Sequence, residues 1–263
     1  MAEGFWVALG LTAMAGLSTS IGGAVGVLGR AKSTRLLALG LGFSAGVMIY
    51  VSLVEILPKG RDHLVAAHGP VSGNWWTIVA FFVGIAVIGI IDRLVPETIN
   101  PHEPGTVDDQ ARSRALMHTG LLTAMALAIH NFPEGFATFI AALQEPQVGL
   151  AVAVAIAIHN IPEGLAVAVP VHQATGSRAK GFWWATLSGL AEPAGALIGY
   201  LLLFRLISES LLGLVFAGIA GIMVFISIDE LLPTAEEYGE HHWAIYGVVA
   251  GMAVMAVSLV LFV

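Results

Sequence analysis

Residues 148–171 read VGLAVAVAIAIHNIPEGLAVAVPV, an apolar stretch with one polar interruption in its middle. A helical bilayer crossing needs roughly 20 apolar residues, so this stretch is long enough to span a membrane. The interruption, His159-Asn160-Ile161-Pro162-Glu163-Gly164, matches a second hexapeptide, His130-Asn131-Phe132-Pro133-Glu134-Gly135, in the apolar stretch 116–142. Ionisable side chains at membrane depth are costly, and they indicate a functional site.

The composition is that of an integral membrane protein. Hydrophobic residues make up 57% of the chain and charged residues 11%, and the mean hydropathy is +0.86. Soluble domains carry about 25% charged residues. Continuous apolar runs favour helices over a membrane barrel, whose strands alternate between polar and apolar residues. We therefore predict an all-α polytopic membrane protein, with residues 1–263 in one membrane domain. Its eight predicted transmembrane helices cover residues 5–28, 36–57, 75–95, 116–142, 148–171, 182–204, 211–232 and 243–263.

An internal repeat relates the second and seventh of these spans. Residues 46–58, GVMIYVSLVEILP, match residues 221–233, GIMVFISIDELLP, at a constant offset. Spans 2 and 7 cross the bilayer in opposite directions, and so do spans 4 and 5. The sequence thus predicts an inverted repeat, in which spans 1–3 correspond to spans 6–8 and spans 4 and 5 correspond to each other. Inverted repeats are typical of secondary transporters, which bind their substrate near the bilayer midplane.

The orientation is predicted from the eleven Lys and Arg residues, because cytoplasmic loops carry an excess of these cations. Eight fall on one side of the spans: Arg30, Lys32, Arg35, Arg93, Arg112, Arg114, Arg178 and Lys180. Three fall on the other: Lys59, Arg61 and Arg205. The first side, with the loop 96–115, is predicted to be cytoplasmic. Both termini then lie outside the cytoplasm, in a multi-pass protein of the cell membrane.

The chemistry of the paired hexapeptides points to a bound cation. Within each copy the His and the Glu are four residues apart and share a helix face. The turn at residues 144–147 is short, so spans 4 and 5 form an antiparallel hairpin, with both His residues roughly 20 Å from the turn. Glu192, beside Pro193 in span 6, is a third intramembrane carboxylate expected at the same site. The candidate metal ligands are His130, Asn131, Glu134, His159, Asn160, Glu163 and Glu192.

Two further observations limit the kind of site. The chain has no Cys, so a metal must be bound by nitrogen and oxygen. No Lys or Arg lies between Arg114 and Arg178, so Glu134 and Glu163 have no cationic partner in their own segment. The simpler interpretation is that Asn and His hydrogen-bond between helices without binding an ion. For Glu55, Asp229 and Glu230, near predicted span ends, contact with water is favoured over contact with the ion. Met48 is expected to pack, and His241 and His242 to lie in a solvated charge run.

With its paired HNxPEG motifs and the Glu192-Pro193 pair, the chain resembles the ZIP (Zrt/Irt-like) family of divalent-metal transporters, close to its bacterial zinc-permease branch. The similarity covers essentially all eight spans. It implies a homodimer and an elevator-like movement of spans 1, 4, 5 and 6 against spans 2, 3, 7 and 8. It also implies one metal position formed by His130, Glu134, His159 and Glu163, and an adjacent one formed by Asn131, Glu134, Asn160, Glu163 and Glu192.

We therefore expect a secondary transporter, not an enzyme, that imports Zn2+ and also Fe2+, Mn2+, Co2+ or Cd2+ through a binuclear midplane site. Imidazole and carboxylate ligands suit these ions better than Ca2+ or Mg2+. The metal is the transported substrate and no cofactor is expected; the other partners expected are the lipid bilayer and a second copy of the chain. A nucleic-acid partner is excluded by the absence of a basic patch. The alternatives are an intramembrane metal-dependent hydrolase, although HExxH is absent, and a proton-coupled carrier of another solute.

Overall fold

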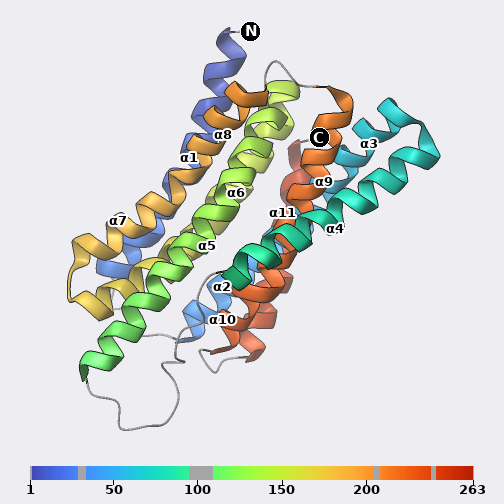
Figure 1. The fold of residues 1–263 in the computed structure, drawn as a ribbon. Helices are drawn as coiled ribbons and strands as arrows, with labels where there is room; N and C mark the ends of the chain where they lie inside the picture. The colour runs from blue at the N-terminus through green and yellow to red at the C-terminus, as the bar shows by residue number, and fades with distance from the viewer. Residues whose placement is uncertain (1, 29–33, 95–108, 204–207, 238–240, 263) are drawn as a thin grey trace.

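The computed structural model describes residues 2–28, 34–94, 109–203, 208–237 and 241–262, and the elements it describes there are all helical (Figure 1). Two short segments, η1 and η2, are π-helical. In chain order the elements are α1 (Ala2–Leu28), α2 (Thr34–Val51), η1 (Ser52–Ile56), α3 (Leu57–His68), α4 (Pro70–Leu94), α5 (Asp109–Gln144), α6 (Pro146–Thr175), α7 (Arg178–Gly189), α8 (Ala191–Leu203), α9 (Glu209–Ile226), η2 (Ser227–Leu231), α10 (Leu232–Glu237) and α11 (His241–Phe262).

These helices confirm the predicted all-α polytopic membrane fold. Among the described residues, seven helical segments are long and apolar enough to cross a membrane. The eighth predicted span is α5, which has 36 residues and carries the first polar hexapeptide. Many large apolar side chains face outward, as lipid contact requires. The loop 96–115 lies mostly outside the described residues, as do Arg30, Lys32 and Arg205.

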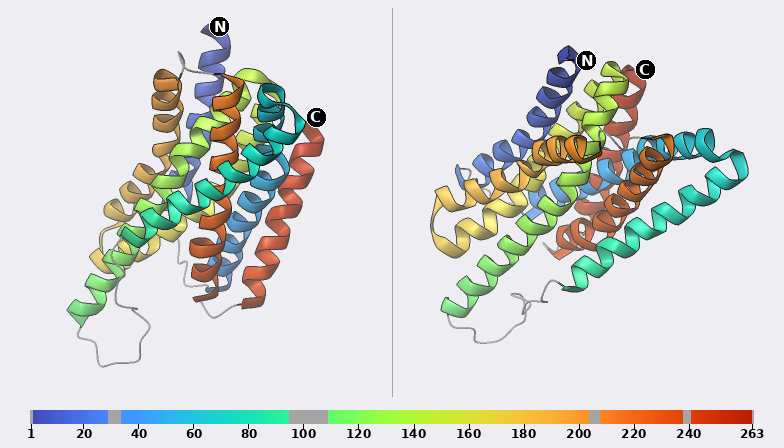
Figure 2. Two further views of the ribbon diagram at one scale, coloured as in Figure 1. Left: turned by 45° about the vertical axis from the view of Figure 1, so that its right-hand side comes forward. Right: turned by 45° about the horizontal axis from the view of Figure 1, so that its top comes forward.

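The helices pack as two groups, which stand side by side in Figures 1 and 2. The first, called the motif group here, consists of α1, α5, α6, α7 and α8. The second, called the flanking group, consists of α2, η1, α3, α4, α9, η2, α10 and α11. The groups meet chiefly where α6 contacts α2 and α11 and where α5 contacts α9. This division matches the grouping of spans 1, 4, 5 and 6 against spans 2, 3, 7 and 8.

Glycine residues at matching positions of the inverted repeat make matching close contacts between helices. A Cβ on Gly46 would lie 2.1 Å from the Val248 carbonyl oxygen of α11. At the matching position of α9, a Cβ on Gly221 would lie 2.0 Å from the Phe81 carbonyl oxygen of α4. The α2–α11 and α9–α4 pairs are therefore equivalent, and both depend on the absence of a side chain at this position. Small residues allow membrane helices to approach closely.

The two π-helical segments occupy identical positions in the repeat. Leu57 N–H donates to the Ser52 carbonyl, and Leu232 N–H donates to the Ser227 carbonyl. The serine hydroxyls add matching bonds one turn back, from Ser52 to the Met48 carbonyl at 2.6 Å and from Ser227 to the Met223 carbonyl at 2.7 Å. The wider π turn lets the helix continue past the proline that follows each segment.

Two helix boundaries differ from those expected from hydropathy. The second span was predicted to end at residue 57, but α3 continues the helix to His68. This polar extension is held against α9, where Leu64 is fully buried and Gly60 lies against Ala217. The sixth span is interrupted at Leu190, which separates α7 from α8 just before Glu192.

The close approach at Gly221 gives a test with a matched control one turn away. Gly221→Ala would place its Cβ 2.0 Å from backbone, whereas a Cβ on Gly218 lies 3.7 Å from the nearest atom outside its own helix, an ordinary contact. We expect Gly221→Ala to lower the stability by about 1–3 kcal/mol, measured as a lower midpoint of thermal unfolding in detergent. Gly218→Ala should keep the midpoint or raise it slightly, since Ala favours helix. Equal midpoints for the two variants would contradict the helix packing.

Candidate metal centre

The seven candidate ligands gather in the middle of the motif group and are fully buried. α5 carries His130, Asn131 and Glu134, α6 carries His159, Asn160 and Glu163, and α8 begins with Ala191 and Glu192. α5 and α6 are joined at Glu145, so they run antiparallel and bring the two hexapeptides to the same depth (Figure 1). The hairpin predicted from the short turn therefore positions the site.

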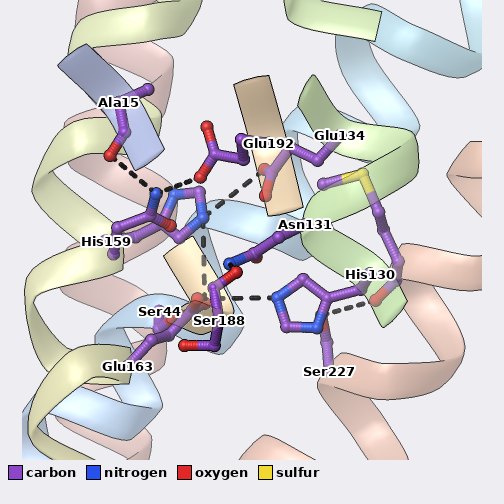
Figure 3. Close-up of polar contacts among 12 residues, drawn as sticks. Ala15, Ser44, His130, Asn131, Glu134, His159, Glu163, Ser188, Glu192 and Ser227 are labelled. Carbon is purple, nitrogen blue, oxygen red and sulfur yellow. Dashed lines mark hydrogen bonds and ion pairs between the residues drawn. The ribbon is translucent and has the colours of Figure 1, made fainter. Parts of the chain in front are cut away.

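The imidazoles approach carboxylates across the helix pair (Figure 3). His130 Nε2 lies 3.5 Å from Glu163 Oε2, and His159 Nε2 lies 3.4 Å from Glu134 Oε1. Within its own copy of the motif, His159 Nε2 lies 3.8 Å from Glu163 Oε1. The closest imidazole-carboxylate contacts thus join α5 to α6. The four side chains form one cluster, because each Glu extends from its own helix to the His of the other.

The two Asn residues anchor the hexapeptides to the neighbouring helices in equivalent ways. Asn131 Nδ2 donates to the Ser188 carbonyl of α7 at 3.1 Å, and Asn160 Nδ2 donates to the Ala15 carbonyl of α1 at 2.9 Å. Asn160 Nδ2 also donates to Glu192 Oε1, which brings the third carboxylate to the cluster. Each Asn therefore has its amide oxygen free to face the site.

The motif glycines let α1 and α8 pack directly on the hexapeptides. A Cβ on Gly135 would lie 2.1 Å from the Glu192 carbonyl oxygen, and one on Gly164 would lie 1.9 Å from the Thr19 carbonyl oxygen. Thr19 is therefore the repeat equivalent of Glu192. The two halves of the repeat therefore differ at this position, with a carboxylate residue on α8 and a hydroxyl residue on α1 whose side chain lies against Gly189 of α7.

The donor set fits a cation better than it fits a closed network of hydrogen bonds. Ten side-chain atoms of the seven residues are buried without a hydrogen-bond partner among the described residues: both ring nitrogens of His130 and His159, both carboxylate oxygens of Glu134, Oε2 of Glu163 and Glu192, and Oδ1 of Asn131 and Asn160. Buried polar atoms normally have partners. Lone pairs on the carboxylate and amide oxygens, and on one nitrogen of each neutral imidazole, could bind a metal ion. In the described part of the chain no three His, Asp or Glu side chains yet converge in coordination geometry, so binding requires small side-chain movements.

Two hydroxyl residues near the cluster were not singled out from the sequence. Ser44 of α2 donates to Glu163 Oε1 at 2.6 Å, and it belongs to the flanking group. Thr138, one turn after Glu134, is 1% exposed, and its Oγ1 lacks a hydrogen-bond partner. A small polar residue in an apolar helix is the only sequence signal for either position. The groups that each hydroxyl can contact depend on which neighbouring helix its side chain faces.

The other polar candidates lie outside the cluster. Glu55 in η1 pairs with Lys59. Asp229 in η2 is exposed and Glu230 is partly buried. Met48 is fully buried in the apolar core, as expected. His241 and His242 are exposed at the start of α11, where His241 Nδ1 lies 2.8 Å from Glu236 Oε1.

Helices long and apolar enough to cross a membrane, seven of them counted among the described residues, surround a buried set of imidazoles, amides and carboxylates. These features define a polytopic membrane protein with a buried polar centre. The family model described as ZIP Zinc transporter matches residues 97–259. The zinc transporter ZupT of Corynebacterium aurimucosum is 63% identical over 257 residues, which cover 97% of this chain and 97% of that protein.

Two further relatives agree. The zinc transporter ZupT of Corynebacterium glutamicum is 61% identical over 97% of this chain and 99% of its own length. That of Streptococcus mutans is 54% identical over the full length of both chains. The chain therefore belongs to the ZIP family, and it is a transporter rather than an enzyme. The resemblance stated from the paired motifs is confirmed, and the hydrolase alternative is excluded.

The unequal bonding of the two Asn residues can be tested by truncation. Asn160→Ala removes the donor to Ala15 and the only hydrogen bond shown for Glu192, whereas Asn131→Ala removes one bond to a backbone carbonyl. A buried carboxylate without its donor costs about 1–3 kcal/mol. We expect a lower thermal midpoint for Asn160→Ala than for Asn131→Ala in metal-free detergent solution. Equal midpoints would show that the Asn160–Glu192 contact contributes nothing.

Proposed function

We propose that this protein imports Zn2+, and also Fe2+, Mn2+, Co2+ and Cd2+, into the cytoplasm through the buried cluster of α5, α6 and α8. The observation that carries the proposal is the set of ten buried nitrogen and oxygen atoms at this cluster that form no hydrogen bond among the described residues, some of them in longer imidazole-carboxylate contacts of 3.4–3.5 Å. The relatives named above as zinc transporters support the choice of zinc as the main substrate. Mixed imidazole and carboxylate ligands suit borderline divalent ions.

The proposed site has two metal positions that share Glu134 and Glu163. The first is formed by these carboxylates with His130 and His159, whose nitrogens lie 3.4–3.5 Å from carboxylate oxygens on the opposite helix. The second is formed by the same carboxylates with Asn131, Asn160 and Glu192, and the hydrogen bond from Asn160 to Glu192 supports this grouping. The first position, with two imidazoles, would prefer Zn2+ or Cd2+, and the second would be weaker and less selective.

Alternating access is the proposed mechanism, because every proposed ligand belongs to the motif group. Movement of α1, α5, α6, α7 and α8 as a unit would carry the ion with its ligands intact. The flanking group contributes one hydrogen bond to these ligands, from Ser44 to Glu163. Sliding of the motif group past α2 would break that bond and leave the ligand set unchanged. A homodimer, implied by the family resemblance, stays a prediction.

The direction of transport follows from the proposed orientation. Arg35 at the start of α2, Arg93 at the end of α4 and Arg178 at the start of α7 lie at one end of the helix bundle, away from both termini (Figure 1). Lys59 and Arg61 lie at the other end, on α3. The positive-inside rule places the arginine-rich end in the cytoplasm of a cell-membrane protein, with both termini outside.

The shared carboxylates provide the main functional test. We expect Glu134→Ala and Glu163→Ala to abolish 65Zn2+ uptake by proteoliposomes, because no other charge at that depth can compensate the ion. His130→Ala and His159→Ala should reduce uptake less, because other ligands and water can complete the coordination shell.

Glu145→Ala is the matched control, since Glu145 is an exposed carboxylate in the turn between the same two helices. It should transport zinc like the unmodified protein. Normal uptake by Glu163→Ala would exclude the cluster as the metal site. Uptake of a different solute with no metal uptake by the unmodified protein would favour the alternative carrier.

The orientation can be tested at the two ends of α6 with a pair of exposed glutamines. Gln147→Cys should react with a membrane-impermeant thiol reagent in intact cells, and Gln173→Cys should react only after the cells are permeabilised. The chain has no Cys of its own, so there is no background reaction. The reverse pattern would invert the topology and, with it, the direction of transport.

A further inference from the structure

A narrow cavity lies between the surface at α3 and the buried cluster, and its lining combines charged, hydroxyl and apolar residues. Glu55 and Lys59 line its outer part, and Glu134 and Thr138 line its inner part. Val152, Ile156 and Phe216 supply apolar walls. The cavity connects two carboxylates, since Glu55 is partly exposed and Glu134 is fully buried. Helix α3, which carries Lys59, lies at the end of the bundle where the termini are found (Figure 1).

Lys59 forms an ion pair with Glu55 in the lining of this cavity. The Lys59 Nζ to Glu55 Oε1 distance is 2.8 Å, and the side chains are 25% and 20% exposed. Glu55 lies in η1 and Lys59 one turn later in α3, so both side chains face the same side of the helix. The Lys59 ammonium is therefore paired with Glu55, the outermost carboxylate of the cavity.

The space available shows that this arrangement is closed to ions. The cavity volume is about 20 Å³, which is room for roughly one water molecule. An ion with a hydration shell cannot pass until a side chain moves. Lys59 is the longest flexible side chain in the lining, and breaking one partly exposed ion pair releases it.

Thr138 supplies a hydroxyl group between Glu55 and Glu134 in the lining of the cavity. Its Oγ1 is buried without a hydrogen-bond partner, and Thr138 lies one turn from Glu134 on the same face of α5. A hydroxyl with free lone pairs can bind a partly dehydrated cation. Glu55, Thr138 and Glu134 thus form a series of oxygen ligands along an otherwise apolar passage.

We infer that Lys59 is a tethered counter-ion that closes the outer mouth and must be displaced from Glu55 by the incoming divalent metal. A divalent ion has twice the charge of the ammonium, so it competes for the carboxylate more strongly. A monovalent ion has the same charge as Lys59 but lacks its tether, and the tether gives the ammonium a high effective concentration at Glu55. Lys59 therefore selects against monovalent cations. The inference rests on the proposed metal import.

The test measures access to the cavity without relying on transport. In a Thr138→Cys background, the thiol is labelled by the monovalent cationic reagent aminoethyl methanethiosulfonate in nanodiscs. Lys59→Gln should raise the labelling rate about fivefold, the factor expected for loss of an ion pair of modest strength. Lys59→Arg should label like the parent, because it keeps the charge. Arg61→Gln is the matched control: it removes a cation from the same helix, but this cation pairs with the exposed Asp62.

Uptake kinetics give the second measurement. Lys59→Gln should lower the KM for 65Zn2+ by a similar factor with little change in kcat, since freeing Glu55 helps capture rather than translocation. In a Glu55→Gln background, Lys59→Gln should have no further effect on KM or on labelling. Unchanged labelling in Lys59→Gln, or an equal effect with and without Glu55, would overturn the inference. If the unmodified protein took up no zinc, the proposed function would fail, and the labelling rates alone would decide whether Lys59 closes the mouth.

Discussion

The burial of imidazoles and carboxylates in mid-membrane, without a Lys or Arg partner among the described residues, is the constraint on which this structure depends. Glu134, Glu163 and Glu192 are fully buried, and their shown partners are His, Asn and Ser side chains. Such carboxylates are costly in an apolar medium unless a cation or a proton compensates them. The arrangement of α5, α6 and α8 serves to hold these groups together.

Backbone contact between helices makes this cluster possible. Gly135 and Gly164 allow α8 and α1 to lie directly on the two hexapeptides, and the same contact brings Glu192 and Thr19 to equivalent positions. Glu192 is linked to the cluster through Asn160, whereas the Thr19 side chain lies against Gly189 of α7. In the proposed mechanism the two metal positions differ because one has the His pair and the other has the Asn pair with Glu192. In the flanking group, Gly46 and Gly221 fix the corresponding helix pairs.

The sequence predicted the parts of the fold that depend on apolar length and on the repeated motifs. Eight spans, the hairpin of α5 and α6, and the internal repeat follow from hydropathy and from matching residues. The π-helical segments did not, because they depend on where a serine hydroxyl bonds the backbone and on how the helix passes a proline. The extension of the second span to His68 was missed because α3 is polar, and its stability comes from packing of Leu64 on α9.

The residues of the site likewise divide into those that the sequence identified and those that it did not. Seven residues were identified from their types and spacing, and the structure brings all seven into one buried group. Ser44 and Thr138 were not identified, because a lone hydroxyl in an apolar helix carries no pattern. The pairing of each His with the Glu of the opposite helix depends on the relative rotation of α5 and α6, which spacing along one helix does not determine. Lys59 was counted as a surface charge, and its position over the cavity became evident only from the fold.

Anomalous diffraction from crystals soaked in Cd2+ tests the central claim most directly, because it locates metal without assuming transport. The account predicts one strong peak within coordination distance of His130, His159, Glu134 and Glu163, and a weaker one on the side of Asn131, Asn160 and Glu192. Glu192→Gln should weaken the second peak and leave the first. Cadmium found only at surface carboxylates, with the buried cluster empty, would contradict the assignment of this cluster as the metal site.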